Sequence, residues 1–148
     1  MQNNKKVKNQ DLLYPELSYK IVGAIYEIWK KFGPAFKESI YQKSLVEEFK
    51  NRNISFVAQK QIPIFYNEKK IGVYTPDFII EDKILLEIKH IPKITFREKK
   101  QARHYLKDSN YKPLLLVNFG GEKLEILRRV YDKARQKFHI NLFRAKFA

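Results

Sequence analysis

Apolar and polar residues alternate along the first third of the chain with the three- and four-residue spacing of amphipathic helices. This spacing predicts a first helix over residues 16–31, which ends at Gly33-Pro34 because proline cannot continue the helical hydrogen-bond ladder. It predicts a second helix over residues 37–51. Four residues of the second helix share one face by the same spacing: Glu38, Tyr41, Leu45 and Glu48.

The middle of the chain changes to short runs of β-branched and aromatic residues separated by polar turns, which is typical of β-strands. A first strand is predicted over residues 55–66, followed by a polar turn over residues 67–70. Pro63 lacks an amide donor, so we expect an edge position or a bulge there. Residues 71–89 predict a hairpin that turns at residues 81–83. Both faces of its second arm are largely apolar, which favours a position near the centre of a sheet.

A third helix and two further strands complete the predicted elements. The helix runs over residues 95–108, with Thr95 as its N-cap and Glu98 completing a capping box. Strands follow over residues 114–119 and 124–131. The helix is long enough for a right-handed crossover between parallel strands. The predicted order, α-α-β-β-β-α-β-β, indicates an α/β fold with a mixed β-sheet flanked by helices.

Three charged residues interrupt the apolar hairpin: Asp77, Glu87 and Lys89. Side chains alternate across a strand, so Glu87 and Lys89 share a face, and a turn about Asp82 places Asp77 opposite Glu87. Two neighbouring carboxylates repel each other, and burying each costs several kcal/mol unless something compensates. A bound divalent cation would compensate. The alternatives are that Asp77 only initiates a turn and that Glu87 only pairs with Lys89.

The spacing of these charged residues suits a magnesium site. Mg²⁺ prefers oxygen ligands in near-octahedral geometry, and the carboxylates of Asp77 and Glu87 with the backbone carbonyl of Ile88 would supply one side of that shell. Lys89 would then orient the attacking water and stabilise charge that builds on a phosphate. Mn²⁺ would serve in the same place.

The composition adds a strong positive charge to this picture. The 148 residues include 30 Lys and Arg against 16 Asp and Glu, a formal net charge of +14. Such an excess attracts polyanions, either nucleic acid or an anionic membrane surface, although a solvated basic surface would give the same count. A basic protein with acids in its central strands is suited to hold a cation beside a bound polyanion.

Other bulk features narrow the class of protein. The length suits a single domain over residues 1–148. The absence of cysteine excludes disulfides and thiolate metal sites, and it fits a cytoplasmic protein. No apolar run approaches the roughly 18 residues that span a bilayer, and the first ten residues do not resemble a signal peptide. We therefore expect nucleic acid rather than a membrane as partner.

Basic residues concentrate in three further places. We expect a basic arm over residues 1–11 and a basic extension over residues 132–148. For the extension we expect a helix whose apolar residues pack on the body: Phe138, Leu142 and Phe143. Around the start of the third helix, four residues would line a channel for the phosphate backbone or form only a solvated face: Lys93, Arg97, Lys100 and Arg103. The histidines show no metal-ligand spacing, and we expect them to be structural: His90, His104 and His139.

Several motifs together resemble a known family. Pro76-Asp77, followed after nine residues by Glu87-Ile88-Lys89, resembles the PD-(D/E)xK nuclease signature. More closely, residues 16–131 resemble the GxxExxY family of small bacterial proteins in that superfamily. The other matching segments lie along the chain in order: Gly33-Pro34, Glu38 to Tyr41, Gln61 to Ile64, Gln101 with Tyr105 and Leu106, and Leu114 to Gly120. Ala35 replaces the glycine that names the family.

The resemblance implies a restriction-endonuclease-like αβββαβ core with an extra N-terminal helix. It assigns the same metal and catalytic roles to Asp77, Glu87 and Lys89. It implies that Glu38 adds a third carboxylate to the metal site, directly or through water, whereas residue chemistry alone would also allow it to complement the helix dipole. Gln101 and Tyr105 resemble the Gln-x-x-x-Tyr pair of RecB-like nucleases, which steadies the site and the substrate backbone; a solvated glutamine and a packed tyrosine are the alternative.

These observations support two functional hypotheses. The first is a Mg²⁺- or Mn²⁺-dependent nuclease that hydrolyses phosphodiester bonds of nucleic acid, with DNA as the expected substrate. The second is a catalytically weak nuclease-fold module that binds nucleic acid or protein within a repair or defence complex. The presence of Asp77, Glu87 and Lys89 together favours the enzyme. The sequence leaves open DNA or RNA, endo- or exonuclease action, specificity, oligomeric state, and the identity of any partner protein.

Overall fold

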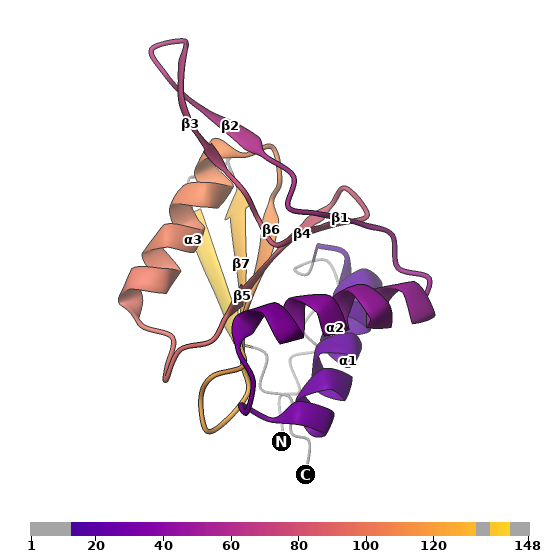
Figure 1. The fold of residues 1–148 in the computed structure, drawn as a ribbon. Helices are drawn as coiled ribbons and strands as arrows, with labels where there is room; N and C mark the ends of the chain where they lie inside the picture. Colours follow the sequence, from indigo (N-terminus) through magenta and orange to yellow (C-terminus); the bar gives the residue numbers. More distant parts are fainter. Residues whose placement is uncertain (1–12, 133–136, 143–148) are drawn as a thin grey trace, which may run out of the picture.

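The fold is described by a computed structural model for residues 13–132 and 137–142 (Figure 1). The elements follow in this order: α1 (Pro15–Phe32), α2 (Glu38–Asn51), β1 (Phe56–Ala58), β2 (Ile62–Tyr66), β3 (Lys69–Tyr74), β4 (Phe78–Ile80), β5 (Ile84–Lys89), α3 (Phe96–Asp108), β6 (Pro113–Asn118), β7 (Glu125–Asp132) and β8 (Lys137–Leu142). The three predicted helices therefore form within one or two residues of their expected bounds. None of the helices in the described ranges is both long and apolar enough to cross a membrane.

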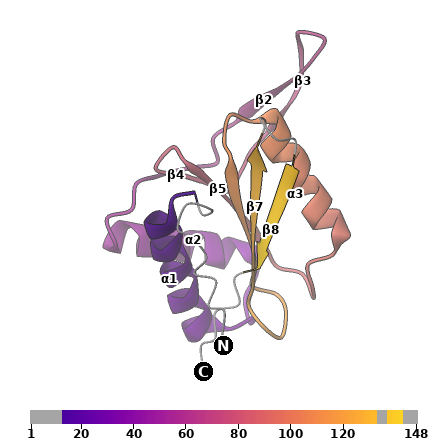
Figure 2. The same cartoon turned by 180° about the vertical axis from the view of Figure 1, so that it is seen from behind.

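Six of the strands form one mixed sheet between two helical layers. The strand order is β1-β4-β5-β6-β7-β8, and only β5 and β6 pair in parallel, on either side of the α3 crossover. Helices α1 and α2 lie on one face of this sheet and α3 lies on the other (Figures 1 and 2). This arrangement confirms the predicted α/β class and is consistent with a restriction-endonuclease-like fold.

Strand β5 lies in the interior of the sheet, as its apolar faces predicted. All of its residues except Lys89 are buried. Leu86 and Ile88 pack into the cluster beneath α1 and α2, whereas Leu85 packs into the cluster beneath α3. Burying an aliphatic side chain contributes about 1.5–3 kcal/mol, so this packing holds β5 rigidly between the layers.

The predicted first strand is wrong in one respect, because two breaks divide the strand region into two sheets. Gln59 adopts a left-handed backbone (φ 57°) and its N–H donates to the carbonyl of Asp77, which ends β1 after Ala58. The predicted hairpin arm breaks before Asp77, next to Pro76, which has no N–H for a ladder. As a result, among the strands that the structure describes, β2 and β3 pair only with each other.

The β2–β3 hairpin turns more tightly than predicted. Its turn is Asn67-Glu68, both with left-handed backbone (φ 46° and 64°), so Lys69 and Lys70 belong to β3 rather than to the turn. Two left-handed residues match the twist of a two-residue hairpin turn. A register shift lies between Ile64 and Phe65, close to the bulge expected from Pro63.

The predicted C-terminal helix is wrong for residues 137–142, which form β8 along the edge of β7. Phe138, Ile140 and Leu142 recur at a spacing of two, which is a strand period. Pairing with β8 also covers the edge of β7, whose backbone groups would otherwise lack partners. Residues 1–11, the expected basic arm, and Phe143 lie outside the described residues.

Candidate functional site

Asp77 and Glu87 lie side by side, as the sequence predicted. Phe78 is opposite Leu86 in the β4–β5 pairing, so the preceding Asp77 comes opposite Glu87. The Ile88 N–H donates to Asp77 Oδ2 at 2.7 Å, which fixes the aspartate against β5. Asp77 is 8% exposed and Glu87 is 9% exposed. Two carboxylates therefore share one largely desolvated place.

Two glutamines hold Asp77 from the other side. Gln42 Nε2 donates to Asp77 Oδ1 at 2.6 Å, and Gln59 Nε2 donates to the same oxygen at 3.3 Å. Burial raises the pKa of Asp77, and the hydrogen bonds from Ile88, Gln42 and Gln59 work against that rise. Gln42 comes from α2, in the other helical layer. The site therefore lies just beyond the end of the β4–β5 pairing, where α2 and β5 both contact Asp77.

Glu87 is held by Tyr74, the last residue of β3. The Tyr74 hydroxyl donates to Glu87 Oε1 at 2.5 Å. Burial raises the pKa of Glu87 to about 7; Asp77 adds to the rise, while Tyr74 and Lys89 oppose it. Burial and the charge of Glu87 also raise the pKa of Tyr74, so its hydroxyl remains a donor.

Lys89 lies among carboxyl groups and forms an ion pair with none of those in the described residues. It is half-buried, and its positive charge lowers the pKa of Asp77, Glu87 and Glu38. The ion pairs within the described ranges involve other residues: Lys30–Glu27, Lys50–Glu47 and Arg52–Glu48. The simple Glu87–Lys89 ion pair is therefore not formed in the described part of the chain, and the ammonium group is available to a bound anion.

Glu38 approaches the same site from the first turn of α2. It is half-buried, and burial raises its pKa, with Asp77 adding to the rise. Lys89 and His90 lower it. The structure thus brings Glu38 within electrostatic range of Asp77 and Lys89, which a role confined to the helix dipole would not require.

The turn before α2 sets the position of Glu38. The Tyr41 hydroxyl donates to the Gly33 carbonyl, and His90 Nε2 lies 2.9 Å from the Pro34 carbonyl oxygen. The rings of Tyr41 and His90 stack with centroids 5.8 Å apart, so His90 is structural as expected. Ala35 is not among the described residues with left-handed backbone, so alanine fits there without strain.

Helix α3 brings Tyr105 to the site, and Gln101 is connected to the site by its hydrogen bond to Tyr105. Tyr105 stacks on Tyr74 with ring centroids 3.7 Å apart and an interplanar angle of 10°. Burial and the nearby Glu87 raise the pKa of Tyr105, and a hydrogen bond from the Gln101 side chain opposes the rise. The predicted pair therefore lies against the residue that holds Glu87, although Gln101 itself is exposed.

A profile of the PD-(D/E)XK nuclease superfamily matches residues 15–130, more than half of the chain. The chain belongs to the PD-(D/E)XK nuclease superfamily. No curated protein and no solved structure matches it closely. Members of the superfamily are typically hydrolytic nucleases and generally use divalent metal ions. The residues that the sequence predicts for the signature lie together beside the β4–β5 pairing: Pro76-Asp77 and Glu87-Ile88-Lys89.

The basic residues predicted to bind nucleic acid are all exposed: Lys93, Arg97, Lys100 and Arg103. They do not all lie on the side of α3 that faces the predicted site. Arg103 lies two residues before Tyr105 and therefore on nearly the opposite side of α3, beside Arg129, whose pKa it lowers. Arg97, in the first turn of α3, lies closer to the Tyr105 side. Contact with nucleic acid stays a prediction for all four.

The side chains of this nuclease-superfamily member fit a hard divalent cation. In the described ranges no three His, Asp or Glu side chains form a ready-made metal cluster, so the candidate ligands are two carboxylates and a carbonyl. Each carboxylate oxygen has two lone pairs. Asp77 Oδ2 accepts the Ile88 N–H, and the Glu87 carboxylate accepts the Tyr74 hydroxyl and the Asp77 N–H, so both carboxylates keep lone pairs for a cation. The Ile88 carbonyl points to the same side of β5 as its N–H, toward Asp77. An all-oxygen set suits Mg²⁺ or Mn²⁺.

Sequence reasoning missed three residues that position the carboxylates: Tyr74, Gln42 and Gln59. Gln42 carried a usable signal, because it lies four residues after Glu38 and so shares its helix face. Tyr74 and Gln59 reach the site because the chain breaks at Gln59 and before Asp77. Pro76 was a local signal for the second break, whereas no local pattern marks the first.

Proposed function

We propose that this protein is a Mg²⁺- or Mn²⁺-dependent nuclease that hydrolyses phosphodiester bonds of DNA. The single observation that carries the proposal is the pair of buried carboxylates, Asp77 and Glu87, at the PD and ExK positions of a nuclease superfamily. Burial of two like charges side by side costs stability. Packing alone gives no reason for two residues that destabilise the fold, whereas metal binding does.

In this proposal Asp77, Glu87 and the Ile88 carbonyl hold the metal ion. The bound ion would supply Lewis-acid polarisation of a phosphate oxygen and a water of lowered pKa. Gln42 fixes Asp77 and Tyr74 fixes Glu87, at 2.6 and 2.5 Å. Such outer contacts keep ligating carboxylates in one orientation.

Lys89 and Glu38 act on the substrate side of the carboxylates. Lys89, unpaired within the described residues, stabilises the negative charge that develops on the phosphate. Glu38 is outside any ready-made cluster in the described ranges, so it acts through water rather than as a direct ligand. Its raised pKa suits a group that exchanges a proton with that water.

Helix α3 would guide the DNA backbone past this site. Tyr105 and Gln101 steady Tyr74 and, through it, Glu87. The exposed basic residues would contact phosphates, which position a substrate without reading its sequence: Lys93, Arg97, Lys100 and Arg103. Lys93 and Arg97 lie nearest the end of β5 along the chain and are the strongest candidates of the four.

Within the superfamily we place the chain in the GxxExxY family. Support comes from the Gly33-Pro34 turn, which Tyr41 and His90 hold, and from Glu38, which follows it. These residues hold the turn that places Glu38 near the carboxylate site.

The test is cleavage of linear, circular and structured DNA in Mn²⁺ and Mg²⁺, followed by addition of EDTA. We expect metal-dependent cleavage that EDTA stops and that Asp77→Asn abolishes. Glu47→Gln, an exposed carboxylate of α2 in a 3.9 Å surface ion pair, is the matched control and keeps full activity. Tight DNA binding by wild-type protein without cleavage in either metal would instead identify the binding module, and equal cleavage by Asp77→Asn would rule out the site.

A further inference from the structure

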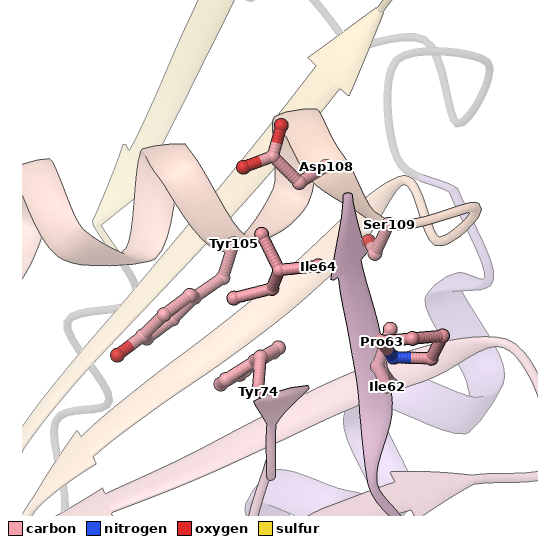
Figure 3. A pocket seen from close by; sticks show the side chains of 7 residues that line it. All are labelled: Ile62, Pro63, Ile64, Tyr74, Tyr105, Asp108 and Ser109. Carbon is pink, nitrogen blue, oxygen red and sulfur yellow. The ribbon is translucent and has the colours of Figure 1, made fainter. Parts of the chain in front are cut away.

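The β2–β3 hairpin stands apart from the main sheet and projects beyond the body of the molecule (Figures 1 and 2). Its inner face packs against α3. Ile62 and Ile64 contact the apolar cluster that contains Tyr74 and Leu106. Figure 3 shows Ile64 pointing toward Tyr105 and Tyr74, and the crevice among them has a volume of only about 10 Å³. That volume is about the minimum for one water molecule, so the inner face is closed.

The outer face of the hairpin is apolar and exposed. Side chains alternate along a strand, so Phe65 shares a face with Pro63, and Ile71 shares a face with Val73, which is opposite Pro63. Phe65 is 61% exposed, Ile71 65% and Val73 41%. We call Pro63, Phe65, Ile71 and Val73 the outer face. Contiguous exposed apolar side chains of this kind mark an interaction surface.

The base of the hairpin is tied to the candidate active site. Tyr74 ends β3, and its hydroxyl donates to Glu87. Lys70, which is opposite Phe65, lies four residues before Tyr74. At about 3.3 Å per strand residue that separation is about 13 Å, or about four base steps of duplex DNA at 3.4 Å each. A nucleic-acid strand that extended from the carboxylates along the hairpin would therefore come within reach of Phe65.

The charges around the outer face select the kind of partner. Three exposed lysines surround it, Lys60, Lys69 and Lys70, against one exposed acid, Glu68. A basic surface with projecting aromatic and aliphatic side chains complements nucleic acid, whose phosphates pair with lysine and whose bases stack on aromatic rings. Bases inside an intact duplex are already stacked on one another. Only unpaired or separated bases offer a free face to Phe65.

We propose that the outer face binds unpaired bases of nucleic acid next to the active site, so that the enzyme prefers single-stranded or frayed substrates. This inference rests on the proposed nuclease function. Phe65 would stack on a base, while Ile71 and Val73 pack against its neighbour as an apolar wedge. Lys69 and Lys70 would contact the adjoining phosphates.

The test compares wild-type protein with Phe65→Ala and Phe65→Trp. Binding of fluorescein-labelled oligothymidylate, oligouridylate and a blunt DNA duplex is measured by fluorescence anisotropy in Ca²⁺, with gels to check that the strands stay intact. We expect Phe65→Ala to weaken single-strand binding roughly ten-fold, the size of one lost base–aromatic stack, with little change for the duplex. Phe65→Trp keeps a ring and retains the affinity. Tyr19→Ala, which removes an aromatic ring that is 81% exposed on α1, is the matched control.

The outcomes separate this inference from the proposed function. If wild-type protein cleaves DNA but Phe65→Ala binds single strands as tightly as wild type, the outer face is not a base-binding surface and the nuclease proposal stands. If Phe65→Ala instead lowers the mass measured by light scattering and leaves binding unchanged, the face joins two copies of the chain and the inference is overturned. If wild-type protein neither binds nor cleaves nucleic acid, both proposals fail. A stronger loss with oligothymidylate than with oligouridylate would identify DNA as the source of the bases.

Discussion

Glu87 makes the stability of the metal-free protein depend on pH. Its pKa is about 7 in the folded protein against an ordinary value of 4.5, because burial disfavours the charged form. Between these two values the folded state holds a proton that the unfolded state has released. The free energy of unfolding therefore falls as pH rises through this window, and the contribution of Glu87 is fully present only below pH 4.5.

The magnitude follows from the same two values. A difference from 4.5 to about 7, at about 1.4 kcal/mol per pH unit, corresponds to about 3 kcal/mol. That is a large share of the roughly 5–15 kcal/mol that stabilises a typical domain. Glu87→Gln keeps an oxygen that can accept the Tyr74 hydrogen bond and removes the charge. The variant is therefore expected to be the more stable protein at pH 8 by about 3 kcal/mol, and close to wild type at pH 4.

Urea denaturation in EDTA at a series of pH values measures this difference. Glu47→Gln, an exposed carboxylate, is the control and should follow the wild-type curve. Saturating Mg²⁺ should narrow the gap at pH 8, since a ligand that binds only the folded state stabilises it. If the free energies of unfolding of wild type and Glu87→Gln change in parallel across the whole pH range, the reasoning is refuted, because burial would then not raise the pKa of Glu87.

Three further predictions concern the residues around the carboxylates. Lys89→Ala should slow single-turnover cleavage about 10²–10³-fold while metal affinity stays unchanged, and Lys83→Ala, on the exposed β4–β5 turn, should not; an unaltered rate would contradict the role. Tyr74→Phe keeps the stack on Tyr105 but loses the Glu87 hydrogen bond, so cleavage should fall about 10–100-fold with DNA affinity unchanged; equal losses in both would indicate a misplaced hairpin instead. Affinity for duplex DNA should fall as salt rises. Charge-neutral replacements at four residues should reduce the slope of log affinity against log salt concentration by about 3–4, or about 0.9 per phosphate contact: Lys93, Arg97, Lys100 and Arg103. A slope that does not respond would show that these residues do not contact phosphates.

The central pair could be predicted from the sequence because a tight turn fixes register. The turn spans residues 81–83, contains a hydrogen bond of 2.9 Å from the Lys83 N–H to the Ile80 carbonyl, and brings Ile80 opposite Ile84, which leaves one alignment of the two arms. Counting outward from that turn places Asp77 opposite Glu87, and the paired residues confirm the count. The capping box at Thr95 was equally readable, because it depends on residues three positions apart.

Features that depend on distant contacts could not be predicted in the same way. Gln59 takes a left-handed backbone without glycine, so nothing local signalled that β1 and β2 are separate strands. In the sequence Tyr74 is indistinguishable from other aromatic strand residues. Its hydrogen bond to Glu87 depends on the break in the chain before Asp77. The strand β8 was missed for a different reason: a period-two pattern was present at Phe138, Ile140 and Leu142, and the helical interpretation overlooked it.

The central claim is that Asp77 and Glu87 together hold a divalent metal ion, and calorimetric titration with Mn²⁺ tests it most directly. Wild-type protein at neutral pH is compared with Glu87→Gln and with the exposed control Glu47→Gln. The account predicts saturable binding by wild type and by Glu47→Gln, with proton release in buffers of different ionisation enthalpy because Glu87 must lose its proton to bind. It predicts that Glu87→Gln loses both the binding and the proton release. Unchanged Mn²⁺ affinity in Glu87→Gln would contradict the account.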